Sequence, residues 1–297
     1  MSHRRAVALM VLATLMWSIA GVVSRFLESA RGFEVTFWRS AFNALALVLL
    51  LGLMKGPGPL WATLRRGGRA LWLSGACWAV MYTAFMMALT LTSVANVLVT
   101  MALGPLFTAL LARAALGHRL AARTWGAIAL AGAGIAWMYG HEVQASDPRA
   151  LLGMAVALAV PVAAAVNWTL LQHLKTRQHA GETPPDMLSA VLVGALLSAA
   201  VTLPLAWPLA TSPHDLGLLA LLGTVQLAIP CLMAVAVARV LSGPEISLLG
   251  LLEVVFGVLW AWLGAGESPS QAVLGGGGLV LLALVGNELL GLRQARP

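Results

Sequence analysis

Two carboxylates stand in the apolar stretch LSGPEISLLGLLEVVFGVLWAWLGAGE (241–267), and they are the residues best suited to chemistry. A charged side chain inside a membrane span is costly, so it is normally paired, faces water or has a function. Glu253 lies near the middle of the run. It could titrate a proton or bind the ammonium of a substrate, or it could hold neighbouring helices together by hydrogen bonds. Both interpretations stay open.

Glu245 directly follows Gly243 and Pro244, which predicts that it occupies the first turn of a helix. Proline is tolerated there, and an acidic side chain complements the helix dipole. That structural role accounts for the residue, and direct contact with a substrate is the alternative. Glu245 and Glu253 would lie roughly 12 Å apart along the helix axis, so both could border one cavity without touching.

Amide, hydroxyl and aromatic side chains in other apolar runs form a second set of candidates. An aromatic pocket suits apolar substrates through stacking and an ammonium group through cation–π contact. Buried amides bind polar ligand groups or form hydrogen bonds between helices. Ordinary helix packing is the alternative for each residue alone. The predicted substrate-binding residues are Trp17, Ser18, Tyr82, Asn96, Asn167, Trp168, Gln226 and Glu245.

Four prolines fall within the apolar runs. Proline removes a backbone hydrogen bond, and such helices border cavities or act as hinges in transporters, although a static kink is the plainer interpretation. The predicted kinks or hinges are Pro105, Pro161, Pro230 and Pro244.

The composition predicts that membrane helices position these residues. Hydrophobic residues make up 60% of the 297 and charged residues only 10%, and the mean hydropathy is +0.89. A soluble domain carries about 25% charged residues. The sequence therefore predicts an all-α integral membrane protein in contact with the lipid bilayer.

Ten apolar runs approach the roughly 20 residues that a membrane-spanning helix needs. They are continuous rather than alternating, which argues against strands. The predicted spans are 6–27, 36–54, 70–90, 94–115, 121–139, 150–172, 187–207, 216–238, 245–264 and 270–291.

The formal charge of +7 does not indicate nucleic-acid binding, because the basic residues lie in short loops rather than on one face. Most of them fall on the side of the N-terminus, which predicts that both termini are cytoplasmic. The histidines lie in tails, loops and span ends, and Cys77 and Cys231 lie apart, so neither a metal site nor a cofactor is expected. No phosphate-binding Gly-Lys motif indicates ATP drive.

The chain also looks internally doubled. A shift of 149 residues sets LGPLF (103–107) against LEVVF (252–256) and Asn96 against Glu245. Five spans per copy would make the copies cross the membrane in opposite directions, as in secondary transporters with a substrate site between their halves. The predicted repeats are residues 1–140 and 150–297, each with five helices.

These motifs resemble the drug/metabolite transporter superfamily, and specifically the EamA family of ten-helix exporters. The family's repeat has Leu-Glu-Pro followed by phenylalanine, and it closes with Gly-Glu. LEVVFGVLWAWLGAGE keeps Glu253 and Glu267 but has Val254 in place of the proline, whereas LGPLFTALLARAALGH keeps Pro105 but has Gly104 and His118 in place of the glutamates. The first span, ATLMWSIAGVVSRF (13–26), is similar to the opening helix of the aromatic amino-acid exporter (YddG-like) branch.

The resemblance implies a secondary transporter, not an enzyme, that exports aromatic or apolar amino acids and related metabolites across a bacterial-type inner membrane. A monomer suffices, since ten spans can build one pathway. Because the family keeps the mid-helix glutamate across many substrates, the resemblance favours a structural role for Glu253. The alternatives are a broad exporter of drugs and cationic compounds, a non-transporting membrane helper subunit and, as a third class, a membrane-embedded enzyme.

Overall fold

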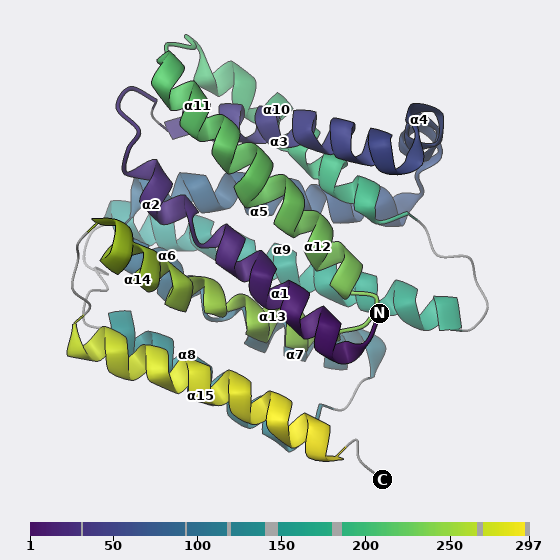
Figure 1. Ribbon diagram of the computed structural model, residues 1–297, viewed down its shortest axis with the longest axis vertical. Helices are drawn as coiled ribbons and strands as arrows, with labels where there is room; N and C mark the ends of the chain where they lie inside the picture. The colour runs from purple at the N-terminus through teal and green to yellow at the C-terminus, as the bar shows by residue number, and fades with distance from the viewer. Residues whose placement is uncertain are drawn as a thin grey trace.

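The structure is a computed structural model that describes residues 1–30, 32–92, 94–117, 120–139, 148–179, 186–265 and 270–294. Every regular element in those ranges is a helix (Figure 1). In chain order the helices are α1 (His3–Trp17), α2 (Ala20–Ser24), α3 (Gly32–Lys55), α4 (Pro57–Arg66), α5 (Arg69–Leu91), α6 (Val94–Met101), α7 (Gly104–Leu116), α8 (Ala122–Tyr139), α9 (Pro148–His179), α10 (Leu188–Ala206), α11 (Pro213–Leu221), the π-helical η2 (Leu222–Ala228), α12 (Ile229–Val237), α13 (Gly243–Gly250), α14 (Leu252–Ala265) and α15 (Gln271–Gln294).

Seven helical segments in the described part of the chain are long and apolar enough to cross a membrane, and two shorter apolar helices accompany them. The protein is therefore an all-α integral membrane protein, as the composition predicts. The segment 213–237 crosses as α11, η2 and α12 in succession, and the segment 3–24 crosses as α1 and α2.

The observed helices follow the predicted spans within a few residues, and α9 extends furthest beyond its predicted end. The connection between the predicted spans 36–54 and 70–90 contains a short helix. The sequence KGPGP (55–59) contains the start of α4, because Gly56 turns the chain with a φ of 83° and Pro57 supplies the first helical turn. Trp61 of this short helix is exposed, and the Arg65 guanidinium lies 4.9 Å from its ring centroid.

The longest helix contacts join the two halves of the chain. α8 packs along α15, α3 packs against α10, and α7 packs against α13 (Figure 1). α5 packs on α9 and α1 packs on α12. The α8–α15 contact is especially close, since a Cβ atom added at Gly276 would lie 2.4 Å from the backbone oxygen of Gly134.

Hydrogen bonds tie the loop after α2 to the start of α11. The Asp215 carboxylate accepts from the backbone N–H groups of Glu28 at 3.0 Å and of Ser29 and Ala30 at 2.8 Å each. It also accepts from the Ser29 hydroxyl at 2.8 Å. Because Asp215 is fully buried, this contact fixes one half of the chain against the other.

Other polar contacts fix the opposite ends of the helices. Lys55 at the end of α3 forms a salt bridge with Asp186, just before α10. Lys175 of α9 donates to the backbone oxygen of Val240 at 2.7 Å, and the Gln172 side chain accepts from the backbone N–H of Gly243 at 2.9 Å.

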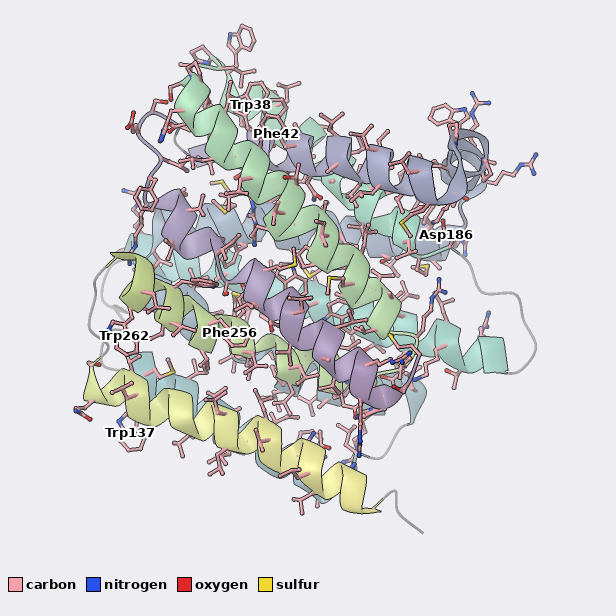
Figure 2. The ribbon with its side chains drawn as sticks, in the orientation of Figure 1. Trp38, Phe42, Trp137, Asp186, Phe256 and Trp262 are labelled. Carbon is pink, nitrogen blue, oxygen red and sulfur yellow. The ribbon has the colours of Figure 1, made fainter. Side chains whose placement is uncertain are left out.

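Tryptophans near the helix ends face outward, as an aromatic belt at the membrane interfaces requires. Trp137 of α8 and Trp262 of α14 are both exposed at the edge of the bundle (Figure 2). The remaining exposed tryptophans are Trp61, Trp72 and Trp207.

Candidate functional site

A cavity lies among helices from both halves of the chain. Its walls come from α1, α3, α5 and the α6–α7 segment, and from α9, η2, α12 and the α13–α14 segment. The cavity volume is ≈ 160 Å³. A single water needs about 10–15 Å³, so the cavity can hold a small organic molecule of about ten water-sized groups.

The cavity forms where transmembrane helices are interrupted. Trp17 ends α1, Met101 and Gly104 flank the break between α6 and α7, and Gly250 and Leu251 mark the break between α13 and α14; all of them line the cavity. Interrupted helices free backbone groups, and membrane proteins tolerate this where the groups meet protein or a water-filled cavity.

Gln226 of η2 compensates for one of these breaks. Its Nε2 donates to the backbone oxygen of Trp17 at 2.9 Å, which satisfies a carbonyl that the end of α1 leaves free. Its Oε1 accepts from Arg39 Nη2 at 3.0 Å. The π-helical stretch, in which each backbone bond spans an extra residue, brings Gln226 into this bridging position.

Arg39 is the strongest charge in the wall. It lies in α3 and is only 4% exposed. Within the part of the chain that the structure describes, its guanidinium donates one hydrogen bond, to Gln226, and its Nε has no acceptor. The guanidinium lies 6.0 Å from the ring centroid of Phe85. A buried cation with so few partners is costly and marks a site that a ligand can complete.

Glu253 supplies the opposite charge. It lies in the first turn of α14, directly after the break at Leu251, and borders the cavity. It lines the same cavity as Arg39. Within the described residues, however, no carboxylate oxygen lies within the 4.0 Å salt-bridge distance of the guanidinium. The two charges therefore face one space without closing it.

Aromatic rings form much of the remaining wall. Trp78 stacks on Tyr82 with ring centroids 5.6 Å apart, and it meets Trp168 edge-on at 5.7 Å. Trp17 and Phe85 complete the aromatic set. Such rings bury a large apolar surface and attract cations to their faces.

Some polar atoms around the cavity have no hydrogen-bond partner. Among the described residues that line it, these are Trp78 Nε1 and Arg39 Nε. Buried polar groups are normally paired, so unpaired ones beside a cavity indicate that water or a ligand supplies the missing partners.

The structure brings together five of the predicted functional side chains at this cavity. Trp17, Tyr82, Trp168, Gln226 and Glu253 line it.

Two further predicted residues contact neighbouring helices instead. The Ser18 hydroxyl accepts from Trp260 Nε1 at 3.0 Å, and the Asn167 carbonyl oxygen accepts from Ser74 at 2.6 Å. Neither Ser18 nor Asn167 lines the cavity.

Asn96 and Glu245 both form local contacts near the start of a helix. Asn96 Nδ2 donates to the Thr92 hydroxyl at 2.6 Å. Glu245 accepts from the Ser242 backbone N–H at 2.8 Å and closes a capping box with that residue. Both residues lie outside the cavity wall, so the structure gives them positions suited to helix capping.

The prolines take two positions. Pro161 lies inside α9 and borders the cavity, as a helix-bending proline would. Pro105, Pro230 and Pro244 each occupy the first turn of a helix, where proline starts a new helix after a break. Glu267 and His118, the other motif positions, lie outside the described residues.

Arg39 and Trp78 line the cavity but are not among the residues predicted from the sequence. Arg39 falls inside the predicted span 36–54. A charge inside a span is itself the signal for an interior functional residue, so Arg39 could have been found. Asn43, one turn further on the same helix face, would have supported it.

The comparisons with known proteins agree with this architecture. A solved structure titled "Crystal structure of protein" superposes with a TM-score of 0.74 at 20% sequence identity, covering 99% of this chain and 100% of that chain. It is among 29 chains of solved structures that match. No curated protein matches significantly. At that identity the likeness shows the fold alone. For sequence, residues 4–140 match the EamA-like transporter family, so this part of the membrane protein carries the pattern of that family.

Proposed function

We propose that the protein is a secondary transporter that exports small aromatic or apolar amino acids and related metabolites by alternating access. The observation that carries the proposal is the cavity between the two halves of the chain, in which Arg39 and Glu253 face one space among aromatic rings. The family match over residues 4–140 supports the general transporter role. We also assign the whole chain to the EamA family and, within it, to the aromatic amino-acid exporter branch.

The proposal includes two inverted repeats, residues 1–140 and 150–297. The break between α6 and α7 begins at Ala102, and the break between α13 and α14 is at Leu251, again 149 residues later. Two close contacts, α8 with α15 and α3 with α10, join helices that this shift makes equivalent. A two-fold axis between the repeats would exchange the two helices of each pair and so map the contact onto itself. The contact pattern therefore supports the axis.

The same symmetry relates contacts of different helices. The shift makes α5 equivalent to the η2–α12 segment and α9 equivalent to α1. The α5–α9 contact thereby corresponds to the contact between α12 and α1. A polar bond crosses each one: Ser74 donates to Asn167 in the first, and Gln226 donates to the Trp17 carbonyl in the second.

Two alternating states follow from this plan. Each repeat would rock about the cavity while the interrupted helices keep their contacts with the substrate. The protein would act as a monomer in a bacterial-type inner membrane, with both termini in the cytoplasm. A broad exporter of drugs and cationic compounds is the second candidate, because aromatic rings and Glu253 would also attract an organic cation.

The test is counterflow in proteoliposomes that contain the purified protein. We expect vesicles preloaded with unlabelled L-phenylalanine to accumulate labelled L-phenylalanine transiently, whereas protein-free vesicles do not. Absence of counterflow for phenylalanine, leucine and tryptophan would contradict an amino-acid transporter.

The coupling mechanism is tested with Glu253→Gln in the same vesicles, with and without a pH gradient. If Glu253 carries the coupling proton, the counterflow that remains in the variant no longer responds to the gradient. An unchanged response to the gradient excludes Glu253 as the proton carrier.

A further inference from the structure

We propose that Arg39 and Glu253 bind opposite ends of a zwitterionic substrate, with Arg39 on the α-carboxylate and Glu253 on the α-ammonium group. The cavity then selects free amino acids over amines or acids that carry only one of these groups. This inference rests on the proposed transport function and assigns the residues that determine its specificity.

Arg39 is held in position but not neutralised. Gln226 Oε1 accepts from its Nη2 at 3.0 Å, and Gln226 is itself fixed by its bond to the Trp17 carbonyl. Among the described residues no carboxylate lies within salt-bridge distance of the guanidinium, and its Nε is buried without an acceptor. A carboxylate is the ligand that a guanidinium fork binds best, because two parallel N–H groups meet its two oxygens.

A neighbouring unpaired group extends the same preference. Trp78 Nε1 is a donor only, and it has no acceptor among the described residues. Together with Arg39 it gives this part of the wall an excess of donors. An acceptor-rich carboxylate satisfies such donors, whereas an ammonium group, which has only donors, cannot.

Glu253 provides the complementary end. Its carboxylate makes no hydrogen bond within the described part of the chain, although it borders the cavity and is half-buried. It lines the same cavity as Arg39 but does not reach salt-bridge distance. A molecule whose ammonium and carboxylate groups are bonded to the same carbon can therefore complete both side chains at once.

The aromatic rings receive the substrate side chain. Trp78, Tyr82 and Trp168 form a stacked and edge-on cluster beside the two charges. An apolar side chain placed there removes its surface from water without pairing any polar group. The cavity thus separates the polar head of an amino acid from its apolar side chain.

The experiment is competition against counterflow of labelled L-phenylalanine in proteoliposomes. The competitors are unlabelled L-phenylalanine, phenethylamine, which lacks the carboxylate, and 3-phenylpropionate, which lacks the ammonium group. In the wild type we expect each truncated compound to compete about 10- to 100-fold more weakly than phenylalanine, because each leaves one buried charge without its partner.

The variants are Arg39→Gln, Arg39→Lys and Glu253→Gln. Arg39→Gln should weaken competition by phenylalanine about 10-fold or more, so that phenethylamine competes almost as well as phenylalanine. Arg39→Lys keeps the charge but loses the planar fork, so it should retain part of the discrimination. In Glu253→Gln, 3-phenylpropionate should instead compete almost as well as phenylalanine. A general loss of folding would not produce these opposite changes.

Ser40→Ala is the matched control. Ser40 follows Arg39 in α3, but its hydroxyl bonds Ser198 of α10 at 2.9 Å, away from the cavity. The control should keep the wild-type order of competitors.

Three outcomes overturn the inference. In the wild type, equal competition by phenethylamine and phenylalanine does so without any variant. Unchanged selectivity in a folded Arg39→Gln protein does so as well, and so does an identical shift in Ser40→Ala. Wild-type vesicles that carry no amino acid would instead refute the proposed function itself.

Discussion

Replacing Asp215 with asparagine should destabilise the contact between the loop after α2 and the start of α11. The carboxylate accepts four hydrogen bonds from the loop after α2, three of them at one oxygen, Oδ2. An asparagine side chain can keep its single carbonyl oxygen at that position. Its NH₂ group then faces the backbone N–H of Glu28, where two donors meet and one is left unpaired.

The magnitude follows from those contacts. An unpaired buried donor costs about 1–3 kcal/mol, and the three remaining bonds lose their charge-assisted component. The Asp215 side chain has no exposed surface, but it lies at the end of the bundle, where solvent screens charges. We therefore expect a loss of about 2 kcal/mol, which corresponds to a melting temperature about 4–8 °C lower.

The assay is thermal unfolding of the purified protein in detergent, followed by tryptophan fluorescence. His214→Gln is the matched control, because His214 is adjacent, more than half exposed and bonded only to Asp215 Oδ1, at 3.3 Å. Its melting temperature should stay near the wild-type value. If Asp215→Asn melts no lower than His214→Gln, the argument that this carboxylate fixes the two halves together is wrong.

Three further predictions concern other parts of the molecule. Gly276→Ala should cost about 1–3 kcal/mol of stability and thereby lower the melting temperature, because its Cβ would lie 2.4 Å from a facing carbonyl oxygen. A Cβ at Gly277 meets nothing within 4 Å, so Gly277→Ala should be neutral. Trp168→Ala should raise the KM for phenylalanine about 5- to 50-fold, about 1–2 kcal/mol of lost ring contact, and change alanine transport less; an equal effect on both substrates would contradict the aromatic pocket. Burial raises the pKa of Asp186, but hydrogen bonds from Lys55 and Ser189 outweigh it, so the pKa lies below its usual value. The salt bridge therefore stabilises the protein above the unfolded pKa of about 4 and loses its effect as the pH falls through the folded value, so the difference in melting temperature between wild type and Asp186→Asn should shrink below about pH 4.

Hydropathy predicts the helices of this protein well because each bilayer-spanning segment must be continuous and apolar whatever it packs against. α10 differs from its predicted range, 187–207, by one residue at each end. The short helix α4 escaped prediction for the opposite reason. It does not span the membrane, and its glycine and prolines, which usually mark connections, here turn the chain and begin a helix.

The breaks within the helices could not be predicted from hydropathy. The residues between α6 and α7 are Ala102 and Leu103, and the break between α13 and α14 falls at Leu251; all are ordinary members of an apolar run. What interrupts these helices is their tertiary surroundings. Pro105 gives a local hint, since a proline in the first turn marks where a helix starts, but Leu251 has no such neighbour.

Glu245 and Glu253 are the same residue type, but only the position of Glu245 is encoded by its neighbours in the sequence. The pattern Ser242-Gly-Pro-Glu245 is a capping box, which local sequence encodes completely, and the structure places Glu245 in that role. Glu253 has no comparable local signature. Its position at the cavity depends on the break at Leu251, which begins a new helix two residues earlier and directs the first turn of α14 toward the cavity.

Arg39 explains why the carboxylate at Glu253 can be retained at this depth. Each charge alone would be an uncompensated ion in a region of low polarity, and direct pairing would leave the cavity closed. A separation beyond salt-bridge distance keeps both charges at one cavity while the space between them stays open to a ligand. Gln226 makes this arrangement stable, since it holds the guanidinium in place and at the same time satisfies the carbonyl that the interrupted helix α1 exposes. The helix breaks, the bridging amide and the two facing charges therefore depend on one another, and a substitution at Gln226 should disturb substrate selectivity as well as the α1–η2 contact.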